Sequence, residues 1–187
     1  MSYKNGHWTV TSSTTILDKP WLKVYEDEVV DASGADTEFY YVELTDGASV
    51  VVLDKDLNVC LIETTRYALQ SKSIEVVSGA REEGETPQQN AEREVAEELG
   101  MESCEWIELG ILHRLPGKIR QTESLFLALG CDTNGSGQHL DSDESLEVIK
   151  IPFTEAVDWV INGKITQAAS CVAILKSEKY LRDNNLL

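Results

Sequence analysis

Residues 79–101, GAREEGETPQQNAEREVAEELGM, are the most informative segment of this chain. Thr86 and Pro87 are a strong helix start, because Thr can cap the first turn and Pro is well tolerated there. Gly100 is a typical helix stop. Between these signals an apolar residue recurs every four positions, at Ala91, Val95 and Leu99. The segment therefore predicts a helix with one buried face.

The same helix would carry three carboxylates, those of Glu94, Glu97 and Glu98, within an arc of roughly 100°. Like charges at these spacings repel each other, and Arg93 is the only basic residue between Gln88 and Met101. A solvated acidic face is one interpretation. A divalent cation is the other, since grouped hard oxygen ligands suit Mg²⁺ or Mn²⁺, which also bridge substrate phosphates. Helix geometry alone leaves both open.

The composition limits the class of protein. The chain has 187 residues, with 33 Asp and Glu against 16 Lys and Arg, and a formal net charge of -17. This length fits one domain with room for a small appendage. A hydrophobic content of 42% favours a packed core over a disordered acidic tail. The negative charge argues against a nucleic-acid partner, which requires clustered Lys and Arg.

The cysteines and the apolar runs bear on the compartment. Cys60, Cys104, Cys131 and Cys171 show no CxxC pair and no framework spacing. We therefore expect reduced, mostly buried thiols. No basic and apolar leader is evident at the N-terminus, and no apolar run is long enough to span a bilayer. The expectation is a cytoplasmic protein without membrane contact.

Strands are predicted on both sides of this helix from β-branched and aromatic runs. They cover residues 8–13, 21–30, 38–44, 48–53, 59–65 and 73–77 before it, and 106–115, 124–129 and 146–151 after it. Two further helices are expected at about residues 154–162 and 165–182. This order fits an α+β sandwich better than a regular βαβα array.

The spacing within residues 79–101 resembles the Nudix box, GX5EX7REUXEEXGU, in which U is a bulky apolar residue. The matching residues are Gly79, Glu85, Arg93, Glu94, Val95, Glu97, Glu98, Gly100 and Met101. Outside the box, Arg66, the EVVSG of residues 75–79, Pro116 and the acidic stretch 140–148 resemble one branch of that family. This branch contains the ADP-ribose and nucleoside-diphosphate-sugar pyrophosphatases.

The resemblance implies an α/β/α sandwich with a mixed β-sheet. Residues 1–47 would form an N-terminal antiparallel strand region that dimerises, and residues 48–187 would form the Nudix hydrolase domain. The implied activity is Mg²⁺- or Mn²⁺-dependent cleavage of ADP-ribose or a related nucleoside-diphosphate sugar to a nucleoside monophosphate and a sugar phosphate. The alternatives are a GDP-mannose-type or other sugar-nucleotide pyrophosphatase, or a non-catalytic nucleotide sensor.

The resemblance also implies the roles of individual residues. Glu94, Glu97, Glu98 and the carbonyl of Ser78 would hold the cations, and Arg93 would orient these carboxylates through Glu85. The general base would come from the acidic stretch 140–148, with Glu144 as first choice and Glu147 as second.

Basic residues would contact the diphosphate or the distal sugar phosphate. Arg66 is the best placed in the sequence, followed by Arg114 and Arg120, with Pro116 between them as a marker of the substrate site. Each of these arginines could equally form a surface salt bridge. The aromatic residues Trp21, Tyr40 and Tyr67 could stack a base, although aromatics at strand positions are more often in the core.

Overall fold

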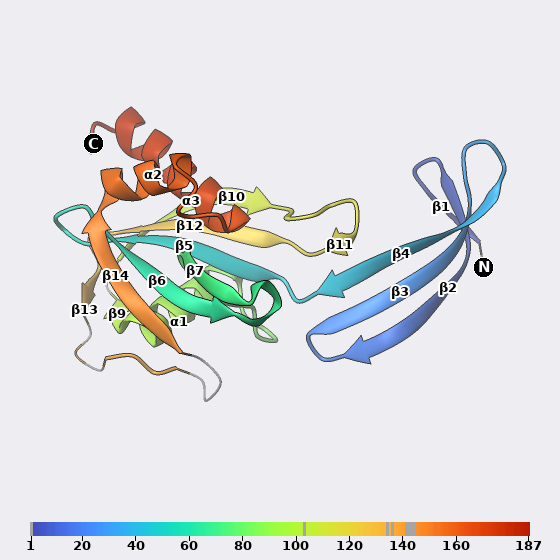
Figure 1. Ribbon diagram of the computed structural model, residues 1–187, viewed down its shortest axis with the longest axis horizontal. Coiled ribbons are helices and arrows are strands. Elements are labelled where there is room, and N and C mark those ends of the chain that lie inside the picture. Colours follow the sequence, from blue (N-terminus) through green and yellow to red (C-terminus); the bar gives the residue numbers. More distant parts are fainter. Residues whose placement is uncertain (1, 103, 134, 136, 141–144) are drawn as a thin grey trace. The chain divides into compact units, whose positions relative to one another are not determined.

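The computed structural model describes residues 2–102, 104–133, 135, 137–140 and 145–187 (Figure 1). The chain forms two compact units. Unit 1 comprises residues 1–45 together with 113–122, and unit 2 comprises residues 46–112 together with 123–187. The segment 113–122 belongs to unit 1 because its short strand pairs in parallel with the last strand of the N-terminal region.

Unit 1 contains one sheet, with the strand order β1-β2-β3-β4-β11. Its strands are β1 (Tyr3–Asn5), β2 (Trp8–Lys19), β3 (Leu22–Val30), β4 (Asp36–Leu44) and β11 (Ile119–Arg120). Strand β2 is longer than the predicted 8–13, because its second half also pairs with β3. The β3–β4 turn is held by the Asp31 carboxylate, which accepts the backbone N–H groups of Ser33 and Ala35 at 2.8 and 3.0 Å.

Unit 2 contains a mixed sheet, with the order β10-β12-β5-β6-β14 and with β7 and β8 attached to β6 and β5. Its strands are β5 (Gly47–Leu53), β6 (Asn58–Arg66), β7 (Ser71–Glu75), β8 (Val77–Ala80), β10 (Glu105–Leu112), β12 (Glu123–Leu129) and β14 (Leu146–Pro152). The helices are α1 (Pro87–Leu99), α2 (Phe153–Ile161) and α3 (Ala168–Asp183). Short elements are the 3₁₀ turn η1 (Tyr67–Leu69) and the paired β9 (Met101–Glu102) and β13 (Asp132–Thr133).

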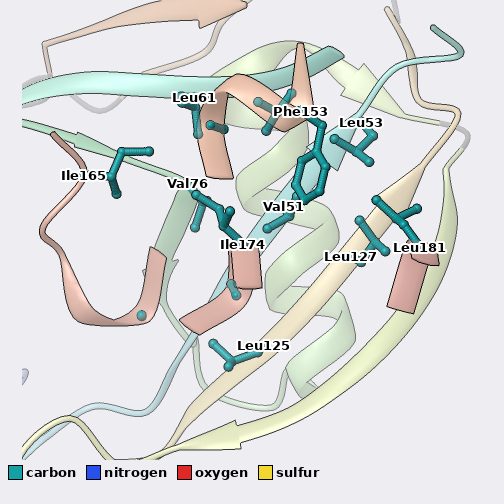
Figure 2. Close-up of a cluster of buried hydrophobic side chains, with 14 residues drawn as sticks. Val51, Leu53, Leu61, Val76, Leu125, Leu127, Phe153, Ile165, Ile174 and Leu181 are labelled. Atoms are coloured by element: carbon teal, nitrogen blue, oxygen red, sulfur yellow. The ribbon is translucent and has the colours of Figure 1, made fainter. Parts of the chain in front are cut away.

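Strand β5 divides the core of unit 2 into two layers. It is buried along its whole length, and its alternate side chains point to opposite faces of the sheet. Val51 and Leu53 pack with Phe153 and the other residues of the α2/α3 side (Figure 2). Val50 and Val52 pack instead on the α1 side, together with Val95. Helices therefore cover both faces (Figure 1), which confirms the predicted α/β/α sandwich.

Helix α1 begins and ends where the sequence predicts. Thr86 and Gln89 form a reciprocal capping box, with Pro87 at the first helical position. Gly100 ends the helix at φ 60°, a left-handed conformation that glycine adopts without steric cost. Among the described residues, no helix is long and apolar enough to cross a membrane.

The predicted strand 73–77 is two strands in the structure. Strand β7 pairs with β6, whereas β8 pairs with β5. Between them the backbone N–H of Val76 donates to Ser170 Oγ of α3 at 3.0 Å instead of joining either ladder. A change of partner strand leaves no mark in the local hydrophobic pattern, so the sequence did not reveal it.

The expectation that all cysteines are reduced is wrong for two of them. Cys104 and Cys131 form a disulfide, while Cys60 and Cys171 are free. The reason lies in the sheet register, in which Glu105 on β10 pairs with Leu129 on antiparallel β12. Cys104 and Cys131 lie just beyond this pair and are consequently neighbours, although 27 positions separate them in the sequence.

We expect the Cys104–Cys131 bridge to stabilise unit 2. A Cys104→Ser/Cys131→Ser variant should lose about 3–4 kcal/mol of unfolding free energy, because the bridge restricts the unfolded chain. Denaturant titration with and without a thiol reductant measures this loss. Reduced wild-type protein should match the double variant, and equal stability of the oxidised wild type and the variant would contradict the prediction.

Candidate functional site

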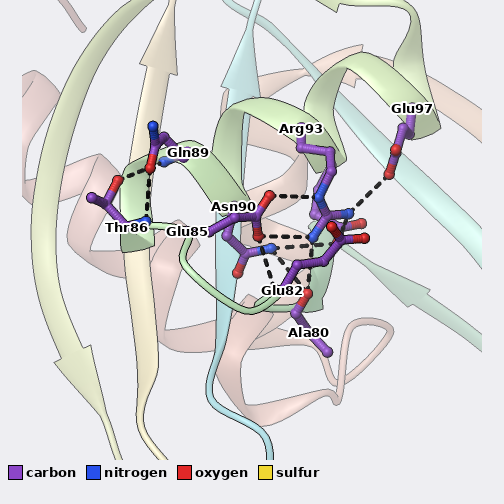
Figure 3. A network of polar contacts seen from close by, with 9 residues as sticks. Ala80, Glu82, Glu85, Thr86, Gln89, Asn90, Arg93 and Glu97 are labelled. Carbon is purple, nitrogen blue, oxygen red and sulfur yellow. Dashed lines mark hydrogen bonds and ion pairs between the residues drawn. The ribbon is translucent and has the colours of Figure 1, made fainter.

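The guanidinium of Arg93, in the middle of α1, connects this helix to the loop before it and to the end of β8 (Figure 3). Its Nε and Nη2 donate to the two carboxylate oxygens of Glu85 at 2.9 and 3.3 Å. Its Nη1 donates to Glu94 Oε1 at 2.8 Å and to Glu97 Oε2 at 2.9 Å. Its Nη2 also donates to the carbonyl of Ala80 at 2.9 Å. The planar fork thus fixes three carboxylates and the end of β8 relative to one another.

Glu85 is the main partner of Arg93. Its hydrogen bonds raise the pKa of the guanidinium, and Arg93 in turn lowers the pKa of the Glu85 carboxyl below its usual 4.5. Glu85 Oε2 also accepts the backbone N–H of Glu82 at 2.9 Å, which closes the loop before α1. Glu85 therefore links the loop to the helix.

Gly79 allows α1 to lie against the end of β8. A Cβ atom at this position would be 1.9 Å from Glu94 Oε1, far inside any normal contact distance. Strand β8 is fixed from its other side by pairing with β5, where Gly79 is opposite Ala48. Glu94 is consequently buried, with an exposed fraction of 7%.

Asn90 belongs to the same network and was not among the predicted site residues. Its Nδ2 donates to the Ala80 carbonyl at 3.2 Å and to Glu94 Oε1 at 3.4 Å. Its residue surface is fully buried. The sequence signal that could have identified it is its position four residues before Glu94, on the same helix face.

A pocket of about 360 Å³ lies at this end of unit 2. Three predicted site residues share its lining, namely Arg66, Ser78 and Glu98. The other lining residues are Ile62, Thr64, Thr65, Ser145 and Leu146. The structure therefore brings one predicted metal ligand, one predicted backbone ligand and one predicted phosphate contact to a single cavity.

The segment just before the acidic stretch 140–148 packs against the carboxyl end of α1. Gln138 Nε2 donates to the carbonyl of Glu98, and the backbone N–H of His139 donates to the carbonyl of Glu97, both at 2.8 Å. These bonds satisfy carbonyls that lack partners within the helix. The chain that leads to the predicted base is thus attached to the helix that bears the glutamates.

Arg66 forms a paired hydrogen bond with Glu75. Its Nε and Nη2 lie 2.9 and 2.7 Å from the two carboxylate oxygens. Glu75 is 1% exposed, whereas the Arg66 side chain is 45% exposed. The arginine is therefore both anchored in an ion pair and accessible at the pocket, so the two interpretations of this residue are compatible.

The two candidates for the general base differ in placement. Glu144 lies outside the described residues. Glu147 is on β14, where Ile149 and Ile151 pack on the α2/α3 side of the sheet. Because side chains alternate along a strand, Glu147 shares that side and Leu146 points to the pocket. The structure does not bring Glu147 to the α1 carboxylates.

Arg114, Pro116 and Arg120 belong to unit 1. Arg120 forms an ion pair with Glu43 and lies over the rings of Tyr25 and Tyr41, 5.3 and 5.2 Å from their centroids. Pro116 and Arg120 line a cavity of about 200 Å³ in this unit.

The three aromatic residues considered for base stacking are not in the core. Their exposed fractions are 67% for Trp21, 42% for Tyr40 and 97% for Tyr67. The Tyr40 hydroxyl donates to Glu38 at 2.8 Å, and this bond raises the pKa of Tyr40 to about 12. All three rings are therefore open to contact from outside the chain.

The donor atoms suit a hard divalent cation, since Glu94, Glu97 and Glu98 offer only carboxylate oxygens. The backbone around these carboxylates also fits a cation site, because the absence of a Cβ at Gly79 leaves the space that the Glu94 carboxylate occupies. Within the described ranges, however, no three His, Cys, Asp or Glu side chains form a group that could hold a metal ion. Arg93 binds two of the glutamates in this arrangement.

Comparison with known proteins identifies two family models that match consecutive parts of the chain. Residues 43–169 match the NUDIX domain, and residues 8–42 match the nucleoside diphosphate sugar hydrolase N-terminal domain. The matched crystal structure of an ADP compounds hydrolase has a TM-score of 0.83 at 17% sequence identity, with all of both chains covered.

Similar curated proteins carry several names. A methanol dehydrogenase activator of Bacillus methanolicus is 26% identical over 82% of this chain and 83% of its own. An ADP-ribose pyrophosphatase of Bacillus subtilis is 23% identical with the same coverage. A GDP-mannose pyrophosphatase of Klebsiella pneumoniae is 29% identical over 92% of this chain and 90% of its own.

The Glu85–Arg93 pair should make stability depend on pH. Since the folded-state pKa of Glu85 is lowered, its contribution is complete above the ordinary value of 4.5 and is lost as pH falls through the folded-state pKa. Glu85→Gln should therefore be less stable than wild type at neutral pH, and the difference should shrink on acidification. Urea titrations across this range measure it.

Glu83→Gln is the matched control, because it removes the same charge from an exposed side chain in the same loop. A constant difference between wild type and Glu85→Gln at all pH values would contradict the assignment.

Proposed function

Because this chain belongs to the NUDIX family of pyrophosphate hydrolases, we propose that it cleaves ADP-ribose or a related nucleoside-diphosphate sugar, using Mg²⁺ or Mn²⁺. The products would be a nucleoside monophosphate and a sugar phosphate. The observation that carries the proposal is the shared pocket of Ser78, Glu98 and Arg66, next to the network of Arg93. Oxygen atoms that would bind the cation and a guanidinium that would bind phosphate line the same cavity.

Glu94, Glu97 and Glu98, with the carbonyl of Ser78, would hold the cation. When bound, the cation neutralises diphosphate charge and stabilises the charge that develops in the transition state. Glu97 has the more accessible carboxylate, since its side chain is 43% exposed and that of Glu94 is 9% exposed. We therefore assign to Glu97 the freedom to exchange its Arg93 contact for a cation contact.

The remaining roles follow from position. Arg93, supported by Glu85, keeps Glu94 against Gly79. Arg66 would donate to a phosphate oxygen from the pocket wall while Glu75 holds it in place. Glu144 is the preferred base, because the loop that leads to it is attached to α1 and Glu147 is on the other face of the sheet.

The substrate class rests on the relatives. Their names include ADP-ribose pyrophosphatase and GDP-mannose pyrophosphatase, which share a nucleoside-diphosphate-sugar substrate. A GDP-mannose-type activity is therefore the second candidate. Arg114, Pro116 and Arg120 remain proposed contacts of the diphosphate or of the distal sugar phosphate.

We also propose a homodimer. Unit 1 leaves large apolar side chains exposed, and a second copy of the chain would cover them. These residues are Tyr3, Ile16, Leu17, Trp21, Tyr40 and Leu115.

A panel of nucleotide sugars and dinucleotides with Mg²⁺ tests the activity. Phosphate release after coupling to a phosphatase should be greatest with ADP-ribose or a close relative. Glu98→Gln should lower kcat by at least about 100-fold, because it weakens electrostatic stabilisation of the transition state. Glu92→Gln is the control on the same helix, since the Glu92 side chain is exposed and accepts a hydrogen bond from Gln88.

Wild-type turnover by Glu98→Gln would contradict the metal assignment. Absence of turnover across the whole panel would favour the nucleotide-sensor alternative.

Gly79→Ala should also reduce turnover strongly. The added Cβ would overlap Glu94 Oε1 and displace this carboxylate by more than an ångström, a shift that can cost about 100-fold in rate. Steady-state kinetics measures the loss, and thermal unfolding verifies that the variant is folded. A folded variant with wild-type activity would exclude Glu94 from the working site.

A further inference from the structure

We propose that Asn90 is a positioning residue that orients the Glu94 carboxylate for cation binding. The inference rests on the proposed role of Glu94 as a ligand. It adds a side chain that donates to this carboxylate without carrying charge.

Asn90 and Arg93 donate to the same two oxygen atoms, and Figure 3 shows both side chains beside Ala80. Ala80 O accepts from Asn90 Nδ2 at 3.2 Å and from Arg93 Nη2 at 2.9 Å. Glu94 Oε1 accepts from Asn90 Nδ2 at 3.4 Å and from Arg93 Nη1 at 2.8 Å. Because both oxygens are acceptors only, the amide nitrogen of Asn90 must face them. The two side chains therefore clamp the end of β8 to Glu94.

Packing does not explain an asparagine at this position. Asn90 is fully buried, and its Oδ1 has no hydrogen-bond partner among the described residues. A buried acceptor without a donor destabilises a fold, whereas an apolar side chain here would avoid this cost. The neighbouring positions Ala91 and Val95 are apolar core residues of the same helix. What Asn90 contributes is its pair of N–H groups.

The neutrality of this donor matters at a cation site. The Arg93 guanidinium and a divalent cation compete for the same negative charge on Glu94, since both are positive. The Asn90 amide holds Oε1 without opposing a cation. It can therefore keep the carboxylate in its orientation when the Arg93 contact weakens.

Direct Mn²⁺ binding without substrate, by electron paramagnetic resonance or calorimetry, tests the inference. Asn90→Ala and Asn90→Leu should each weaken Mn²⁺ affinity by about 10- to 100-fold, as loss of a supporting hydrogen bond to a metal ligand does. Thermal unfolding verifies that each variant is folded. Turnover at saturating Mn²⁺ should approach the wild-type kcat.

Gln88→Ala is the matched control. Gln88 Nε2 donates to Glu92 Oε1 at 2.8 Å, an amide–carboxylate pair with the same spacing on the exposed side of α1. Its loss should leave Mn²⁺ affinity unchanged.

The possible results separate this inference from the proposed function. Wild-type Mn²⁺ affinity in a folded Asn90→Ala or Asn90→Leu variant would overturn the inference alone. Recovery of affinity in the Leu variant but not the Ala variant would also overturn it, because volume rather than the donor would then matter. No Mn²⁺ binding by the wild type would refute the proposed metal site itself.

Discussion

The Arg93 guanidinium holds together the candidate site of unit 2. Its fork reaches the loop before α1 through Glu85, the helix itself through Glu94 and Glu97, and the sheet through the Ala80 carbonyl. Five hydrogen bonds of this kind need a planar, permanently charged donor, which lysine could not replace. Because the loop, the helix and the strand all bond to the Arg93 guanidinium, the positions of the glutamates depend on one another.

The packed sheet of unit 2 holds the partners of the Arg93 guanidinium in place. Strand β5 is buried on both faces, and its pairing with β8 fixes Gly79 at the place where Glu94 approaches. Ala91 and Val95 bind α1 to the same face of the sheet. A carboxylate with a 7% exposed fraction is tolerated there because Arg93 and Asn90 donate to it. Local acidity thus coexists with a packed core, and the net charge of -17 includes carboxylates that Arg93 holds in this network.

Prediction from the sequence succeeded where the signal is local. The Thr86 cap, the Gly100 stop and the four-residue apolar spacing of α1 depend on neighbours within a few positions, and the structure has all three where the sequence predicts them. It failed where partners are distant in sequence. The split of 73–77 into β7 and β8 depends on which strand each segment joins, and the Cys104–Cys131 bridge depends on the β10–β12 register. The side of the sheet on which Glu147 lies likewise follows only from the packing of β14.

The amino-acid sequence by itself identified the family, through its resemblance to the Nudix box, and located helix α1, because the cap, the stop and the apolar spacing of a helix are local signals. Only the tertiary structure decided which of the predicted residues meet. It placed Ser78, Glu98 and Arg66 at one pocket, assigned Arg120 to a cluster in unit 1, and added Asn90 to the Glu94 network. These outcomes depend on strand order and register, which arise from burial of whole faces and not from any short motif.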